Sequence, residues 1–260
     1  MPYLSFMSDE HLEKCIDILF NKYEKTKRKF TEKEFYKNQV DPIKLLFDTS
    51  FFGTTEEQKI LEEIQRKIDK TISNAIGEFH EDLIGGIKGY KKHPVGKGFD
   101  ITDENCEKLF ADIKNKHNTV TGTHLCNLYI KLEGYIEGTK EGKSYWVQII
   151  SSGSSFEEPW VYENKDKTKV YKNPNVYKVS ADKFYEILTG NPNAFSELCE
   201  VLPHAIEKFL EDKTIKPISD KNSEVYNIIN QKAKENGVSF INQIMNDTFS
   251  NYNGFPIGKK

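Results

Sequence analysis

Arginine is almost absent from this sequence. Of its 37 lysine and arginine residues only Arg28 and Arg66 are arginines, and the base composition of the encoding genome is the simplest source of that bias. A lysine ammonium lacks the planar fork with which a guanidinium binds phosphate or guanine through two hydrogen bonds. The formal net charge of −3 also argues against a strongly basic nucleic-acid binder. Recognition of any partner must therefore rely on other side chains.

Other features are missing as well. No apolar run approaches the ~18 to 20 residues that span a bilayer, so no membrane segment is expected. The first residues lack the basic-then-apolar pattern of a secretory signal. The four cysteines are scattered without a CxxC pair, which favours reduced thiols in the cytoplasm. Aromatic residues are plentiful, with 17 Phe, 13 Tyr and 2 Trp, and they can build a core.

Helical patterns dominate the first third of the chain. Apolar residues recur at helical spacing after Ser8, and Asp41-Pro42 places an N-cap before a proline at the first helical position. A longer apolar stripe after Thr54-Thr55 ends at Gly85-Gly86. Residues 1–86 are therefore expected to be helical.

The rest of the chain changes from strand-like to helical patterns. Aromatic and β-branched runs predict strands at residues 99–102, 108–116, 128–132 and 145–150. A polar, turn-rich stretch follows over residues 151–174, and helices are expected at residues 180–190, 194–211 and 223–235. We expect one α/β domain over residues 1–260, in which a catalytic sheet over about 96–150 precedes a helical, recognition part over about 151–260.

The most informative segment runs from Gly96 to Thr119, GKGFDITDENCEKLFADIKNKHNT. Alternation on a strand places Asp112 and Lys114 on one face, about 6 to 7 Å apart along the strand, and apolar residues on the other. Asp100 lies twelve residues before Asp112, so a hairpin would bring the two carboxylates together. Two apposed carboxylates need a cation, and Mg²⁺ suits them. A neighbouring lysine can then orient or deprotonate a water that attacks phosphorus.

Acid-x-Lys triplets are common in so charged a chain, but only the Asp112 copy lies on an alternating strand with a glycine-led acid before it. A third acid could come from the preceding helix. On a helical wheel Glu81 points almost opposite the apolar stripe, into solvent, whereas Glu78 and Asp82 flank it. A solvated helix face is an equally good interpretation of each.

These residues occur in a pattern that resembles the PD-(D/E)xK nuclease superfamily, and more closely the type II restriction endonucleases that cut GGNCC or GGWCC DNA. The resemblance rests on the segments IGEFHEDLIGGIKGY, GFD, ADIKNKHNT, YWVQII and FYEILTGNPNAFSEL. It implies a PD-(D/E)xK nuclease-like core, a mixed β-sheet flanked by helices, with helical N- and C-terminal parts. It also implies Mg²⁺-dependent cleavage of double-stranded DNA that leaves 5′-phosphates, by a homodimer whose two-fold axis matches the palindrome.

The same resemblance assigns roles to individual residues. Asp100 and Asp112 take the places of the two metal-binding acids and Lys114 that of the catalytic lysine, although glutamate is expected where Asp112 stands. Glu78 takes the place of the helix acid. The resemblance further implies a DNA methyltransferase as a functional partner.

The residues after Lys114 suit DNA recognition, because amides, lysine and imidazole can donate to guanine and a hydroxyl can contact phosphate. The expected DNA contacts are Asn115, Lys116, His117, Asn118, Thr119, Lys92, Lys97, Ser154 and Ser155. A zinc site built from His117, His124 and Cys126 is an alternative, but the spacing is unusual and a fourth ligand is lacking.

Three other functions stay open. A structure-selective or repair nuclease of the same superfamily would explain the acids and the lysine but not KNKHNT. A non-catalytic DNA-binding protein would leave Asp100, Asp112 and Lys114 without a use. A lysine-rich structural protein is compatible with the charge runs but leaves the apposed acids unexplained.

Overall fold

The computed structural model describes residues 2–28, 41–94, 96, 98–120, 122–211, 213 and 224–258. Within these ranges the chain forms two compact units, one made of Cys15–Phe79 and the other of Met1–Lys14 with His80–Lys260. The expectation of a single domain over residues 1–260 stays a prediction. No helix in the described ranges is long and apolar enough to cross a membrane.

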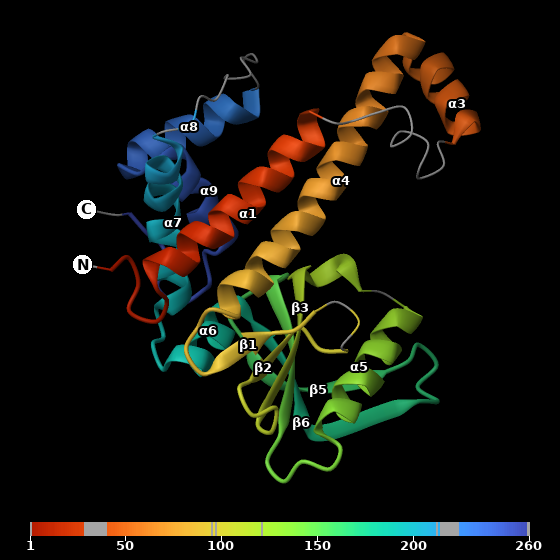
Figure 1. The fold of residues 1–260 in the computed structure, drawn as a ribbon. Helices are drawn as coiled ribbons and strands as arrows, with labels where there is room; N and C mark the ends of the chain where they lie inside the picture. Colours follow the sequence, from red (N-terminus) through yellow and green to blue (C-terminus); the bar gives the residue numbers. More distant parts are fainter. Residues whose placement is uncertain are drawn as a thin grey trace. The chain divides into compact units, whose positions relative to one another are not determined.

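The predicted N-terminal helices are confirmed, and they are drawn in red to orange in Figure 1. Asp41 caps the short helix as expected, since its Oδ1 accepts the N–H groups of Ile43 and Lys44 at 3.0 Å each. Gly53 ends that helix in the left-handed conformation, with φ of +62°. Within the described ranges 2–28 and 41–94 these helices are α1 (Asp9–Arg28), α3 (Pro42–Phe52) and α4 (Glu56–Ile84), and residues 29–40 of the expected helical part lie outside the described residues.

A six-stranded mixed sheet forms the centre of the second unit, in the order β1-β2-β3-β4-β6-β5. The first three strands are antiparallel neighbours, β3, β4 and β6 are parallel, and β5 returns antiparallel to β6. The strands are β1 (Tyr90–Lys92), β2 (Ile101–Asp103), β3 (Leu109–Lys116), β4 (Lys143–Ile150), β5 (Glu157–Glu163) and β6 (Val170–Ser180). The predicted α/β class with a mixed sheet is therefore confirmed.

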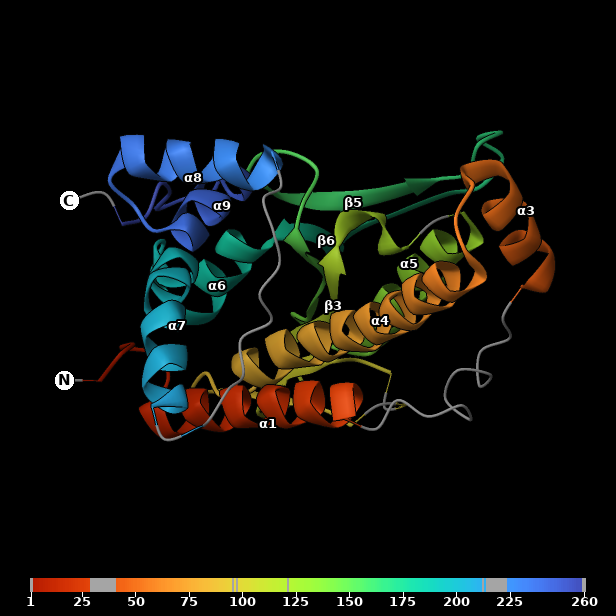
Figure 2. The same cartoon turned by 90° about the horizontal axis from the view of Figure 1, so that it is seen from above.

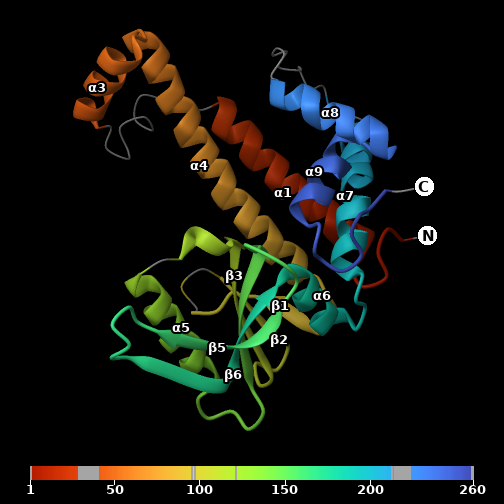
Figure 3. The ribbon, with the colours of Figure 1, turned by 180° about the vertical axis from the view of Figure 1, so that it is seen from behind.

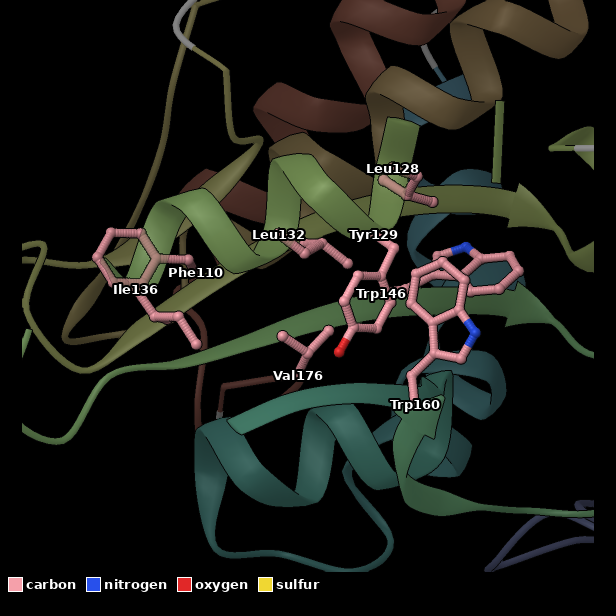
Figure 4. Close-up of a cluster of buried hydrophobic side chains, with 8 residues drawn as sticks. All are labelled: Phe110, Leu128, Tyr129, Leu132, Ile136, Trp146, Trp160 and Val176. Carbon is pink, nitrogen blue, oxygen red and sulfur yellow. The ribbon is translucent and has the colours of Figure 1, made fainter. Parts of the chain in front are cut away.

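The predicted strand at residues 128–132 is wrong, because this segment belongs to helix α5 (Thr123–Ile136). Its apolar residues recur at intervals of three and four, so a helix presents them as one stripe to the sheet. Figure 4 shows Tyr129 and Leu132 projecting from α5 toward Trp146 and Trp160. Strand alternation would have turned every second one of them to solvent. The whole cluster consists of Phe110, Leu128, Tyr129, Leu132, Ile136, Trp146, Trp160 and Val176.

The turn-rich interpretation of residues 151–174 is also wrong over half of its length. Strand β5 and the first residues of β6 occupy it and form a long hairpin. Buried Trp160 and Val176 attach this hairpin to the α5 side of the sheet, while most of its other residues are exposed and polar. The exposed face gave the segment its loop-like composition. Irregular structure is left at residues 151–156 and in the turn around Asn164, whose N–H donates to Lys169 O at 3.1 Å.

The opposite face of the sheet is covered by α6 (Ala181–Thr189), whose Phe184 ring lies 5.8 Å from that of Tyr145 on β4. Figure 3 shows α5 and α6 on either side of the strands. The predicted helices at 180–190, 194–211 and 223–235 are confirmed as α6, α7 (Ala194–Leu210) and α8 (Glu224–Asn236). An unpredicted helix, α9 (Phe240–Thr248), begins after the N-cap Ser239 and lies beside α8 in Figure 2.

Candidate active site

The predicted hairpin that joins the two acids is confirmed. Strand β2 pairs antiparallel with β3, with Ile101 opposite Ala111. The Asp100 N–H donates to Ala111 O at 2.9 Å, and Asp100 Oδ2 accepts the N–H of Ile113 at 2.7 Å. The register therefore places Asp100 beside Asp112, with its side chain held by the backbone of the neighbouring strand.

Glycine is required before this acid. Gly98 has φ of +103°, in the region that L side chains rarely adopt, and an added Cβ would lie 3.4 Å from the Tyr135 ring of α5. The Tyr135 hydroxyl donates to Gly98 O. The turn that delivers Asp100 to the site is thus fixed against helix α5.

Another aspartate holds the far end of the same hairpin. Asp103 Oδ1 accepts the backbone N–H groups of Lys108 and Leu109 at 3.0 and 2.9 Å. Partial burial opposes its charge, but these backbone donors outweigh burial and lower the pKa of Asp103 below its ordinary value. Asp103 stabilises the hairpin, whereas Asp100 belongs to the site.

The site concentrates negative charge in a buried place. Asp112 is only 1% exposed, and burial together with the Asp112 charge raises the pKa of Asp100. The Ile113 N–H, Lys114 and another lysine, Lys131, act in the opposite direction. Lys114 forms an ion pair with Asp112 Oδ1 and donates to the carbonyl of Ile113 at 3.2 Å. Asp100, Asp112 and Lys114 thus converge at one end of the sheet.

Sequence reasoning missed Lys131. It lies on α5, and its Nζ is 2.5 Å from Asp112 Oδ2. Assigning residues 128–132 to a strand hid it, because Lys131 and Tyr135 are neighbours one turn apart on a helix, whereas a strand would hold them about 13 Å apart. The carboxylate of Asp112 therefore receives one lysine on each oxygen, Lys114 from its own strand and Lys131 from the helix above.

The helix acids differ from the expectation. The prediction that Glu81 points into solvent is wrong, since its side chain is 19% exposed and lies 3.3 Å from Lys92. Burial and then the charge of Asp100 raise the pKa of Glu81. A helical wheel describes α4 alone and does not include strand β1, which returns beside the last turn of α4. The approach is close, because a Cβ added to Gly85 would lie 2.7 Å from Lys92 Cβ.

The two other candidate helix acids have lysine partners. Glu78 pairs with Lys22 inside the Cys15–Phe79 unit and is half exposed. Asp82 accepts from Lys92 at 2.8 Å, and its backbone carbonyl accepts a hydrogen bond from the His11 ring. Burial disfavours the charge of Lys92, but Asp82 and Glu81 outweigh it and raise the pKa of Lys92. The carboxyl of Glu81 interacts with the charges of Asp100 and Lys114.

Most of KNKHNT lies at the exposed end of β3. Lys116 ends the strand, and His117–Thr119 form a single 3₁₀ turn in which the Thr119 hydroxyl donates to Lys116 O at 2.8 Å. Lys116, Asn118 and Thr119 are exposed, and Asn115 and His117 are half-buried. Alternation places Asn115 on the face opposite Lys114. These residues are available at the surface, apart from the partly enclosed His117 ring.

A cavity of about 550 Å³ adjoins the acids on the α5-facing side of the sheet. Cross-strand register continues Asp112 to Trp146 and then to Lys178, so the acids and the cavity wall lie on one face, with strands about 4.8 Å apart. Lys178 in turn pairs with Glu158 at 2.8 Å. The polar or amphipathic residues that line it include His117, Trp146, Gln148, Ser154, Glu158 and Lys178.

The remaining predicted DNA contacts have mixed positions. Ser154 lines the cavity and is exposed, whereas the Ser155 backbone N–H donates to Asn251 O at 3.3 Å in the C-terminal segment. Lys92 lies among the helix acids, as described above. Lys97 lies outside the described residues.

The donor set suits Mg²⁺ better than zinc. Among the described residues no three His, Cys, Asp or Glu side chains gather as a metal-binding group, and this includes His117, His124 and Cys126. Mg²⁺ commonly takes one or two carboxylates and completes its shell with waters and substrate phosphates. Asp100 and Asp112, apposed on neighbouring strands with Asp112 buried and Asp100 half-buried, provide that pair.

The chain is similar to known proteins over nearly its whole length. The family model described as Eco47II restriction endonuclease matches residues 4–211. The type II restriction enzyme Sau96I of Staphylococcus aureus is 37% identical over 262 residues, covering 97% of this chain and 98% of that protein. The type II restriction enzyme Eco47II of Escherichia coli is 34% identical over 219 residues, covering 82% and 90%. The matched residues include the hairpin of acids, Lys131 and the cavity.

Proposed function

The chain belongs to the Eco47II restriction endonuclease family, and on that premise we propose that this type II site-specific deoxyribonuclease uses Asp100, Asp112 and Lys114 to cut a GGNCC- or GGWCC-type palindrome with Mg²⁺. The observation that carries the proposal is the hairpin that apposes the two carboxylates beside Lys114. The site sequence itself rests on the resemblance of the motifs.

In the proposed mechanism Asp100 and Asp112 hold the ion. Bound there, Mg²⁺ would neutralise charge on the scissile phosphate and make a nearby water more acidic. Lys114 lies beside Asp112 and is 31% exposed at its side chain, so it can orient the attacking water and accept its proton when neutral. The water oxygen bonds to phosphorus as the bond to the 3′-oxygen breaks, and the leaving 3′-oxygen takes a proton from solvent water. The products are a 5′-phosphate and a 3′-hydroxyl.

We assign the helix acid of this site to Glu81. Its carboxyl is largely buried and interacts with Asp100 and Lys114, which supports a role in holding waters around the ion. Glu78 is the residue that the resemblance favours, and it pairs with Lys22. Comparing glutamine variants of the two separates these assignments.

The cavity beside the acids is the proposed place of base recognition. It combines hydrogen-bonding groups with aromatic walls and shares a sheet face with Asp112. His117 and Ser154 come from the predicted set of contacts, and Gln148, Glu158 and Lys178 add to it. A lysine can donate to guanine O6 and N7 and a carboxylate can accept from cytosine N4, so guanine and cytosine can be read without arginine. Of the other predicted contacts, Asn115, Lys116, Asn118 and Thr119 are assigned to the surrounding DNA surface, whereas contacts by Lys92, Lys97 and Ser155 stay predictions.

A palindromic site calls for two active sites related by a two-fold axis, so we propose a homodimer. A DNA methyltransferase would protect the host's own sites. Action on DNA in the cell interior agrees with four cysteines that are all free thiols.

Mapping the ends of cleaved plasmid tests the proposal. Incubation with Mg²⁺ should give discrete fragments with 5′-phosphates at GGNCC or GGWCC sites, and Lys114→Ala should give none. Random nicks would indicate a structure-selective nuclease, and binding without cleavage a non-catalytic DNA-binding protein. Full cleavage by Lys114→Ala would contradict the assigned mechanism.

A further inference from the structure

Helix α5 places a cation, Lys131, beside the acids, and no sequence motif predicted it. Lys131 Nζ lies 2.5 Å from Asp112 Oδ2, and its side chain is 39% exposed. The Asp112 side chain is 2% exposed, so the ammonium reaches down from the surface to a buried carboxylate. The Lys131 side chain is therefore open to water, whereas the Asp112 carboxylate is not.

The position of Lys131 is supported by its own helix. Its Nζ lies 5.7 Å from the centre of the Tyr135 ring, which offers the ammonium an attractive aromatic face. The Tyr135 hydroxyl donates to Gly98 O, so the same tyrosine also fixes the turn before Asp100. Tyr135 therefore contacts both Lys131 and the turn before Asp100, and these contacts orient Lys131 toward the acids.

The location of the ammonium matters because Asp112 is also a proposed metal ligand. A carboxylate oxygen 2.5 Å from an ammonium nitrogen has no room for a divalent ion on the same side. Lys131 also partly neutralises two carboxylates that would otherwise repel each other in a buried place. It does so without a metal.

We infer that Lys131 is a resident counter-cation of the active site, which pairs with Asp112 in the DNA-free protein and must withdraw before a divalent metal ion binds there. Because its side chain is partly exposed, Lys131 can move toward solvent or toward a phosphate of bound DNA. Metal binding is thereby weakened until DNA is present. This inference rests on the proposed function, because it takes Asp112 as a metal ligand.

Mn²⁺ binding to the full-length, DNA-free protein tests the inference, measured by calorimetry or by the loss of the free-ion electron paramagnetic resonance signal. Lys131→Met removes the charge and keeps the length of the side chain. It should tighten Mn²⁺ binding about tenfold, because one positive charge close to a divalent ion is removed. Lys131→Arg retains the charge and should bind Mn²⁺ as the wild type does.

One control variant and a second measurement make the result specific. Lys140 is exposed in the loop after α5, and Lys140→Met should leave Mn²⁺ affinity unchanged. Thermal melting should show that Lys131→Met is less stable than the wild type without metal and gains more from added Mg²⁺, which also reports whether the variant is folded.

Unchanged or weaker Mn²⁺ binding by folded Lys131→Met would overturn the inference, since a purely structural lysine would give that result. If the wild type still cut plasmid at discrete sites, the proposed function would stand without it. If no variant bound Mn²⁺ and no cleavage occurred, both would fall.

Discussion

The α5-facing side of the sheet has an acid end around Asp100 and Asp112 and a cavity end around Trp146 and His117. The two ends differ in how their polar groups are paired. At the acid end, Asp112 has a lysine ammonium beside each carboxylate oxygen, although Oδ1 has only the ion pair and no hydrogen bond, and Asp100 accepts a backbone N–H. At the cavity end, Trp146 Nε1 and His117 Nδ1 are buried without a hydrogen-bond partner among the described residues. Buried polar groups are normally paired, so the cavity end lacks what a ligand would provide. This difference agrees with the proposed roles, chemistry at the acid end and base recognition at the cavity end.

The largest effect should come from the acid end. Asp112→Asn removes the charge that would hold the metal in the proposed mechanism, and we expect single-turnover cleavage to fall about a thousandfold. DNA affinity without metal should persist or increase, because a negative charge near the phosphates is lost. Rapid-quench kinetics and filter binding measure the two effects.

Asp166→Asn is the matched control for this prediction. Asp166 lies in the exposed turn between β5 and β6, where it accepts from Thr168. It should cleave at the wild-type rate. An Asp112→Asn enzyme that cut within tenfold of the wild type would remove the distinction between the two ends.

A change at the cavity end should alter selectivity instead. Lys178→Met removes a donor that lines the cavity, and we expect about tenfold or more loss of preference for the cognate site over one with a single changed base pair. Lys172→Met on the exposed part of the same strand should keep the preference. Competition between the two oligonucleotides measures the ratio. Equal losses in both variants would mean that Lys178 contributes only general charge.

The acid end could be predicted from the sequence and the cavity end could not, and the reason is physical. The hairpin of acids is local, since twelve residues separate Asp100 from Asp112, and alternation with a glycine before the first acid was enough to place both. The cavity instead needs parallel pairing of β4 with β6, whose partners are more than 25 residues apart in sequence, as with Ser144 and Val176. No local pattern encodes that pairing.

Errors in secondary structure had consequences for the site. Residues 128–132 are rich in apolar side chains whether they face a core as a strand or as a helix, and the short run did not distinguish the periods. Choosing a strand concealed Lys131. Glu81 was misplaced for a different reason, because a helical wheel describes one helix and carries no information about the strand that returns beside it.

A smaller effect distinguishes the helix acids. Glu81→Gln should slow cleavage by about tenfold, because its carboxylate interacts with Asp100 and Lys114. Glu78→Gln makes the same chemical change three residues earlier on α4 and should have the weaker effect. Single-turnover rates across a Mg²⁺ titration compare them, and a requirement for more Mg²⁺ in Glu81→Gln would place its role at the ion. A larger loss in Glu78→Gln would assign the helix acid to Glu78.

The smallest effects concern stability, and they contrast the two aspartates of one hairpin. The pKa of Asp103 is lowered by backbone donors, so its stabilising contribution is present above the ordinary value of about 3.8 and is lost as pH falls through the lower folded value. The pKa of Asp100 is raised by burial and by Asp112, so its contribution is present below about 3.8 and is lost as pH rises through the higher folded value.

At pH 7.5 without metal, Asp103→Asn should therefore lower the free energy of unfolding by about 1 kcal/mol. Asp100→Asn should raise it by a similar amount while abolishing cleavage, as expected where an active site trades stability for function. Urea unfolding at pH 7.5 and pH 4.5 measures both, and the gain from Asp100→Asn should shrink at the lower pH. A destabilised Asp100→Asn at pH 7.5 would mean that the hydrogen bond from Ile113 outweighs the repulsion between the acids.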